Sequence, residues 1–125
     1  GADALVVEGS EAGGHIGPVS TSVLAQEILP HITDVPVFVA GRIGRGEVMA
    51  SYLKMGASGV QLGTMFVCAE ESIAHEDFKK MFMRGNGDVE RGSVMAGQSG
   101  GMVKKIQPVS EIMANLIEQA AEQLA

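Results

Sequence analysis

Three short apolar runs recur along the chain, at residues 4–7, 37–40 and 60–62. None of them alternates apolar with polar residues, a pattern typical of strands that are buried on both faces in a parallel sheet. Each run is followed closely by glycine, and the stretches between the runs are long enough to hold a helix. The pattern therefore predicts three parallel strands with helical connections, in the order strand, helix, strand, helix, strand.

The connecting segments carry recognisable helix signals. In the first, we expect a helix that begins at a polar cap, ends at Pro30 and buries Val23, Leu24 and Ile28; the candidate caps are Ser20, Thr21 and Ser22. The second helix is expected to begin at Gly46, with Gly56 as its left-handed cap. Residues 1–6 resemble residues 56–61, and repeated units of this kind build barrels or doubly wound sheets.

The last third of the chain predicts two more helices. The first covers about residues 70–83, and a glycine-rich segment follows it up to residue 101. The final helix begins at Pro108 and carries a stripe that needs a partner surface, formed by Ile112, Leu116, Ala120 and Leu124. No linker interrupts the pattern, so we expect one α/β domain over residues 1–125.

Composition excludes several classes of function. The formal net charge is -6 and aromatic residues make up only 4%, which disfavours nucleic-acid binding. No segment has the apolar length of a membrane span. The single cysteine, Cys68, excludes an internal disulfide and fits a reducing cytoplasm; its apolar surroundings predict a buried, inert thiol. Three histidines without close pairing disfavour a metal site.

The loop after the first run carries the candidate chemistry. It contains Glu8, Glu11 and His15, and glycines flank the histidine on both sides. Loops at the carboxyl ends of parallel strands are where α/β proteins place their active sites, and a histidine there can transfer protons near neutral pH. The alternative is a structural histidine in a turn. We favour proton transfer for His15 and leave the roles of both glutamates open.

Glycine also follows the second and third strands. The second leads into Gly41-Arg42-Ile43-Gly44-Arg45-Gly46, directly before a helix, and the third into Gly63-Thr64. Two adjacent glycine loops at strand ends can hold a cofactor phosphate through backbone N–H groups. Alternatively, these glycines only permit tight turns. We favour the phosphate site.

These residues together resemble a known family. The segments E-G-S-E-A-G-G-H-I-G, V-P-V-F-V-A-G, G-A-S-G-V-Q-L-G-T-M-F and G-S-V-M-A-G-Q-S-G-G are similar to those of nitronate monooxygenases, once called 2-nitropropane dioxygenases. FMN-dependent enoyl-ACP reductases share the same motifs. The resemblance implies a (β/α)8 TIM barrel that binds FMN, of which this chain would supply the sixth, seventh and eighth strands and the C-terminal segment.

The resemblance also implies roles for individual residues. His15 would be the catalytic base that removes the acidic proton beside a nitro group; the nitronate would then give an electron to the flavin, and oxygen would complete the reaction. The residues implied in FMN binding are Gly13 and Gly14 after the first strand, Gly41 after the second, Gln61, Leu62, Gly63 and Thr64 after the third, and Gln98 in the loop 95–98 that closes over the pocket. We add Arg42 as a cofactor-binding residue that supplies positive charge to the phosphate; the alternative is that its side chain crowds the backbone there.

The chain departs from the family pattern in three places. Arg42 stands where the family usually has glycine, and Met65 stands where it often has arginine. A long segment that covers flavin and substrate in relatives is almost absent between Met83 and Asn86. Two alternatives to a nitronate monooxygenase therefore stay open: an NAD(P)H-dependent enoyl-ACP reductase, and a non-catalytic barrel fragment. We expect a small-molecule substrate for the enzyme. As protein partner, we expect either a second copy of the chain or a polypeptide that supplies the complementing half of the barrel.

Overall fold

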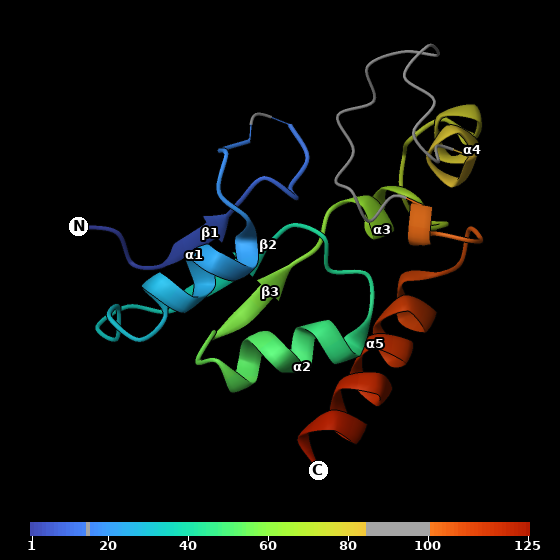
Figure 1. Cartoon of the computed structure of the whole chain (residues 1–125). Helices are drawn as coiled ribbons and strands as arrows, with labels where there is room; N and C mark the ends of the chain where they lie inside the picture. Colours follow the sequence, from blue (N-terminus) through green and yellow to red (C-terminus); the bar gives the residue numbers. More distant parts are fainter. Residues whose placement is uncertain (15, 85–100) are drawn as a thin grey trace.

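The computed structural model describes residues 1–14, 16–84 and 101–125. It contains a three-stranded parallel sheet in the order β1-β2-β3, formed by β1 (Leu5–Glu8), β2 (Val37–Ala40) and β3 (Gly59–Gln61). The connections are α1 (Thr21–Ile28) and α2 (Gly46–Lys54). The predicted order of strands and helices is therefore confirmed, and Figure 1 shows it in blue through green.

One face of the sheet forms the main core. Val7 of β1 lies beside Val39 of β2, and both are buried against Ala25 of α1 and Tyr52 of α2. Both connecting helices therefore cover the same face. The residues that alternate with these valines point to the other face of the sheet.

The prediction that the first strand is buried on both faces is wrong. Leu5 is 36% exposed and Val6 is 53% exposed, while Val7 alone is buried. β1 lies at the edge of the sheet, and α1 and α2 both pack on the face that carries Val7. The side chain of Val6, on the opposite face, is therefore left exposed. The apolar sequence of β1 therefore did not predict its burial, because nothing in the described chain covers this edge strand.

The helix signals are largely confirmed. Ser20 is the cap of α1 and its hydroxyl accepts a hydrogen bond from the Val23 N–H at 3.4 Å. Gly56, with φ of +105°, follows α2 in the left-handed conformation. The expected burial of Val23 is wrong, because Thr21 and Ala25 form the inward face of α1 and leave Val23 43% exposed.

The predicted helix over residues 70–83 is wrong in its first half. The chain instead forms a short helix, α3 (Thr64–Val67), then a turn, and then α4 (Glu76–Arg84). The turn is organised around Lys79, which is only 4% exposed and donates to the carbonyl oxygens of Ala69 (2.6 Å) and Ser72 (2.9 Å). Carbonyls that bind this buried ammonium are satisfied without a helix.

The C-terminal helix α5 (Val109–Leu124) packs along α2 (Figure 1). Ile112, Leu116 and Ala120 are buried within the chain, whereas Leu124 is 48% exposed. The stripe predicted to need a partner surface is therefore already covered at three of its four residues by the chain itself. No described helix is both long enough and apolar enough to cross a membrane.

Candidate functional site

Three loops meet at the carboxyl edge of the sheet, because the strands are parallel and each loop follows a strand end. The loop after β1 is fastened by local hydrogen bonds. The Gly9 N–H donates to Thr21 Oγ1 at 3.2 Å and the Ser10 N–H donates to the Val19 carbonyl at 2.8 Å. A side chain at Gly9 would lie 2.4 Å from the Thr21 nitrogen, so only glycine fits there. These contacts fix the start of the loop that carries Gly13 and Gly14.

The loops after β1 and β2 contact each other. Gly41 has φ of +97°, and a Cβ atom there would lie 3.1 Å from the Cα of Ala12, which is itself buried. This contact brings the first two predicted cofactor loops together. Sequence reasoning did not single out Ala12, and no local signal marks it.

Arg42 occupies a backbone position suited to glycine. Its φ is +53°, and it is the only non-glycine residue with positive φ among the described residues. The left-handed conformation costs a side chain about 1–2 kcal/mol. Arg42 itself is exposed in the loop after β2.

The loop after β3 is open. A side chain at Gly63 would meet no atom within 4 Å, and in the described chain the N–H groups of Gly63 and Thr64 have no hydrogen-bond acceptor. Gln61 is exposed at the end of β3. Leu62 is half-buried and packs against the main core.

The start of α2 does not add to an anion site. The Gly46 N–H donates to Gln119 Oε1 of α5 at 2.8 Å. Arg45 forms a two-point ion pair with Glu47, with Nε and Oε2 separated by 3.1 Å, and this hydrogen bond lowers the pKa of Glu47. An ionised carboxylate already lies at this helix end. The predicted anion nest is therefore corrected to the part of the loop before Arg45.

Some predicted residues lie outside the described residues, namely His15, Gln98 and the rest of the loop 95–98. Glu8 ends β1 in an exposed position in the same row as Ala40 and Gln61, on the face away from α1 and α2. Glu11 is half-buried, and its charge adds to burial in raising the pKa of Tyr52.

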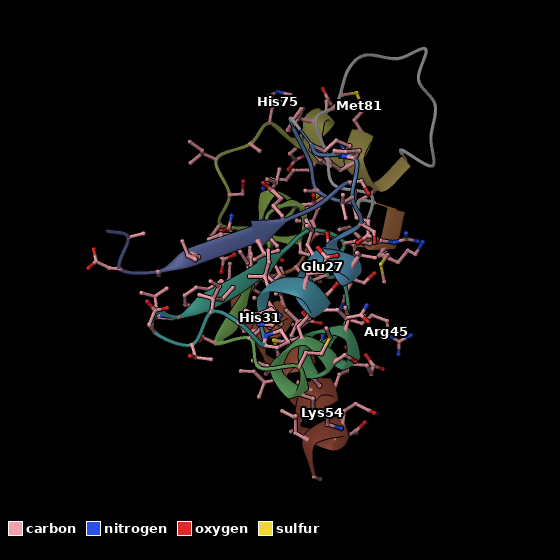
Figure 2. The ribbon with its side chains drawn as sticks, turned by 60° about the vertical axis from the view of Figure 1, so that its left-hand side comes forward. Glu27, His31, Arg45, Lys54, His75 and Met81 are labelled. Atoms are coloured by element: carbon pink, nitrogen blue, oxygen red, sulfur yellow. The ribbon has the colours of Figure 1, made fainter. Side chains whose placement is uncertain are left out.

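The remaining candidate groups are remote from this edge or inert. Figure 2 shows His31 and His75 far apart, and both are exposed. In the described part of the chain, no three histidine, cysteine or acidic side chains group in a way that could hold a metal ion. Cys68 is 1% exposed and burial raises the pKa of its thiol, which confirms the buried thiol predicted from the sequence.

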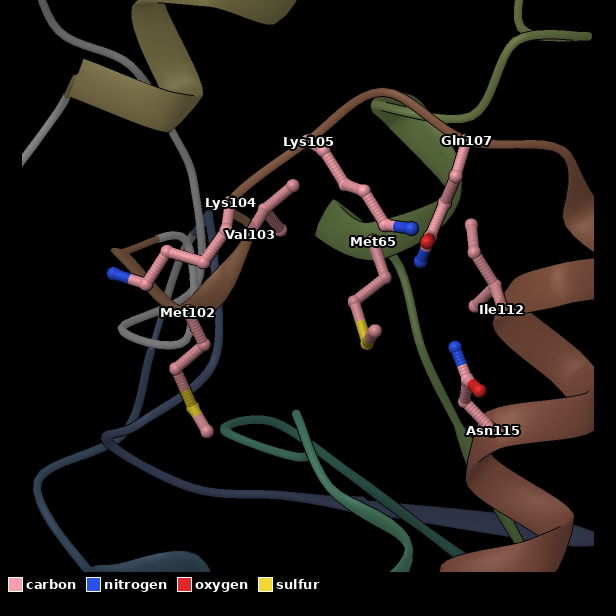
Figure 3. Close-up of a pocket in the computed structure, with 8 residues that line it drawn as sticks. All are labelled: Met65, Met102, Val103, Lys104, Lys105, Gln107, Ile112 and Asn115. Atoms are coloured by element: carbon pink, nitrogen blue, oxygen red, sulfur yellow. The ribbon is translucent and has the colours of Figure 1, made fainter.

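A separate cavity of about 180 Å³ lies between α3, α5 and residues 102–107, which precede α5 (Figure 3). Met65, Ile112 and Asn115 line it together with residues 102–105 and 107. Gln107 Oε1 is buried and has no hydrogen-bond partner among the described residues. Met65 stands next to Thr64, so this cavity borders the loop after β3 but contains none of the predicted cofactor residues.

Comparison with known proteins identifies the family. The family model for nitronate monooxygenases matches residues 1–86. The chain belongs to the nitronate monooxygenase family. This family match covers β1, β2 and β3 and all three loops described above, whereas α5 lies outside it.

Individual relatives in this family have different names. A Mycobacterium tuberculosis (3aS,4S,5R,7aS)-5-hydroxy-7a-methyl-1-oxo-octahydro-1H-indene-4-carboxyl-CoA dehydrogenase is 35% identical over 108 residues, which are 85% of this chain and 30% of the relative. A Staphylococcus aureus protein described as a probable nitronate monooxygenase is 38% identical over 86 residues, 61% of this chain and 24% of the relative. The chain therefore spans less than a third of these relatives.

Solved structures agree on the fold. FabK from Thermotoga maritima, as an M276A mutant, superposes with a TM-score of 0.89 at 31% identity, over 99% of this chain and 54% of that chain. Nitroalkane oxidase from Streptomyces ansochromogenes gives a TM-score of 0.80 at 24% identity, over 99% of this chain and 53% of that chain. The chain spans about half the length of these proteins.

Proposed function

We propose that this chain forms the cofactor-phosphate and proton-transfer end of an FMN-dependent oxidoreductase that acts on alkyl nitronates or nitroalkanes with molecular oxygen. In this proposal β1, β2 and β3 correspond to strands six, seven and eight of a (β/α)8 barrel. The observation that carries it is that three family-matched loops follow the strands at one edge of the sheet, the first two of them in contact through Gly41 and Ala12. That edge is where barrel enzymes place their active sites.

The described residues fit an FMN phosphate. A Cβ atom at Gly63 or Gly14 would meet nothing within 4 Å, so a bound group can approach the backbone closely at both. The N–H groups of Gly63 and Thr64 offer donors to phosphate oxygens, and Arg42 adds a positive charge in the neighbouring loop. In barrels, the loops after the last two strands commonly bind phosphate, and under this proposal these are the loops after β2 and β3.

The chemistry divides between the cofactor and the chain. Bound FMN would supply an electron acceptor at this edge. Under the proposal, His15 as neutral imidazole removes the proton from the carbon beside the nitro group, and Gly13 and Gly14 leave room for the flavin next to that base. Gly41 and Gly63 orient the cofactor by holding its phosphate.

A second candidate is an NAD(P)H-dependent enoyl-ACP reductase. The likeness to FabK over 99% of this chain favours it, since FabK resembles this chain at 31% identity and nitroalkane oxidase at 24%. Both candidates use the same phosphate site and differ in the reductant. The third possibility, a non-catalytic fragment, rests on the short span between Met83 and Asn86.

The test is the absorbance of the purified chain between the ultraviolet and the blue, followed by anaerobic reduction. A yellow protein bleached by an alkyl nitronate supports the monooxygenase. Bleaching by NADH or NADPH, with no response to nitronate, would favour the reductase. A folded but colourless protein that takes up no added FMN would contradict both enzyme proposals.

We also propose the cytoplasm as its compartment, on the basis of the free, buried Cys68.

A further inference from the structure

Lys79 is a buried cation that the proposed chemistry does not use. It lies in α4, is only 4% exposed, and donates to the carbonyl oxygens of Ala69 at 2.6 Å, Ser72 at 2.9 Å and Glu70 at 3.5 Å. Within the described ranges no carboxylate forms an ion pair with it. An ammonium away from water is stable only while hydrogen bonds replace its hydration. Lys79 therefore fixes the turn 69–72 in the conformation that supplies these carbonyls.

The same turn is also tied to α5. The Glu70 N–H donates at 3.0 Å to the carbonyl of Gln107, just before this helix. The N–H of Val109, the first residue of α5, donates to both carboxylate oxygens of Glu71, at 3.1 Å and 3.0 Å. Because Pro108 at the cap position makes no side-chain hydrogen bond, Glu71 supplies the cap. The turn is therefore held from two sides, by the buried ammonium of α4 and by the first turn of α5.

Backbone hydrogen bonds lead from this turn to the open loop after β3. The N–H groups of Phe66 and Val67 both donate to the Gly63 carbonyl, at 3.0 Å and 3.1 Å, and the Ala69 N–H donates to the Phe66 carbonyl at 3.2 Å. The helical turn that begins at Gly63 therefore ends at the residue whose carbonyl binds Lys79. With four residues, α3 is too short to keep its shape alone, so its geometry depends on what holds its ends.

The two ends of α3 are held unequally. A Cβ atom at Gly63 would meet nothing within 4 Å, whereas Ala69 is 1% exposed and bound by Lys79. We infer that Lys79 is a positioning residue for the cofactor phosphate. By fixing the Ala69 end of α3, it holds the N–H groups of Gly63 and Thr64 in the orientation that binds phosphate. This inference rests on the proposed function and adds to it a residue of α4, outside all three loops.

The first experiment compares the affinities for FMN and for riboflavin, which has the same ring system and no phosphate. Lys79→Met keeps the length of the side chain and removes the ammonium. Lys80→Met is the matched control, because Lys80 is the next residue of α4, is 45% exposed and pairs only with Glu76 at 3.6 Å among the described residues.

In flavin fluorescence titrations, we expect Lys79→Met to weaken FMN binding about tenfold or more, as the loss of one hydrogen bond to a charged group would. Riboflavin binding should stay within about twofold, and Lys80→Met should leave both flavins unaffected. A merely structural role of Lys79 predicts equal losses for the two flavins, and that result would overturn the inference.

The second experiment needs no flavin. Hydrogen exchange reports whether the Gly63 carbonyl still holds the amides of Phe66 and Val67. We expect Lys79→Met to speed exchange at these two amides about tenfold while the amides of α2 keep their rates. Unchanged exchange in α3 would overturn the inference. A parent chain that binds neither flavin would contradict the proposed function, and the exchange rates would still decide whether Lys79 holds this turn.

The third measurement uses the unmodified chain, so it does not depend on the folding of a variant. Coupling between two sites is reciprocal. If the turn 69–72 orients the phosphate donors, bound FMN must in return stabilise that turn. We expect saturating FMN to slow hydrogen exchange at the Ala69 and Glu70 amides, and riboflavin to have no such effect. Equal effects of FMN and riboflavin at these amides, or none from either, would overturn the inference.

Discussion

α2 and α5 approach each other closely at Gly46, and replacement of this glycine by alanine tests how the C-terminal helix is held. A Cβ atom at residue 46 would lie 2.2 Å from the Leu116 carbonyl oxygen and 2.7 Å from the Ala120 nitrogen. Both are backbone atoms in a helix, so no side-chain rotation relieves the clash. Gly46→Ala must therefore push the two helices apart.

The size of the effect follows from three terms. Overpacking of this kind costs about 1–3 kcal/mol. Separation of the helices also weakens the 2.8 Å hydrogen bond from the Gly46 N–H to Gln119 Oε1, worth about 1 kcal/mol. The better helix propensity of alanine offsets at most about 1 kcal/mol of this lost stability. We expect Gly46→Ala to lower the free energy of unfolding by about 2 kcal/mol.

Urea unfolding followed by circular dichroism provides the measurement, and Gly63→Ala is the matched control. A Cβ atom at Gly63 meets nothing within 4 Å, so this variant should remain within about 0.5 kcal/mol of the parent. Gln119→Ala should cost about 1 kcal/mol alone and much less in the Gly46→Ala background, where the same bond is already weakened. Equal stability of Gly46→Ala and Gly63→Ala would refute the packing of α5 on α2.

Three further outcomes are expected. Gly63→Val should lower FMN affinity roughly 100-fold or more, by blocking two N–H donors to phosphate, while far-ultraviolet helicity stays the same; unchanged affinity in a flavin titration would remove Gly63 from the site. His15→Asn should lower turnover of a neutral nitroalkane by about a hundred- to ten-thousand-fold and turnover of a preformed nitronate much less; equal losses in paired steady-state assays would show that His15 is not the base. Burial raises the pKa of Cys68, so the unfolded thiol ionises first and folded stability falls as the pH rises above about 8.5. Cys68→Ala should show a shallower loss of stability between neutral and alkaline pH in urea unfolding, and identical pH profiles would contradict this assignment.

The site could be predicted from the sequence only as a set of loops. Runs of apolar residues followed by glycine indicate where strands end, and parallel strands place those ends at one edge. The sequence could not show that Gly41 touches Ala12, that Gln119 occupies the Gly46 N–H, or that Leu62 turns into the core. These contacts join residues that are far apart in the chain or depend on how an element packs.

The sequence by itself determined the local features of this protein. Helix starts at Ser20 and Gly46, the turn at Gly56 and the three strands depend on neighbouring residues, and their patterns are short-ranged. Its motifs also indicated the nitronate monooxygenase family, which the family model over residues 1–86 confirms.

Only the tertiary structure decided which apolar surfaces are covered. Val6 and Ile112 are equally apolar in sequence, yet the first lies open at the sheet edge and the second is buried under the chain's own helices. The buried Lys79 likewise breaks a helix that the pattern alone predicted. Burial depends on how distant segments pack against one another, and a local pattern carries no information about those partners.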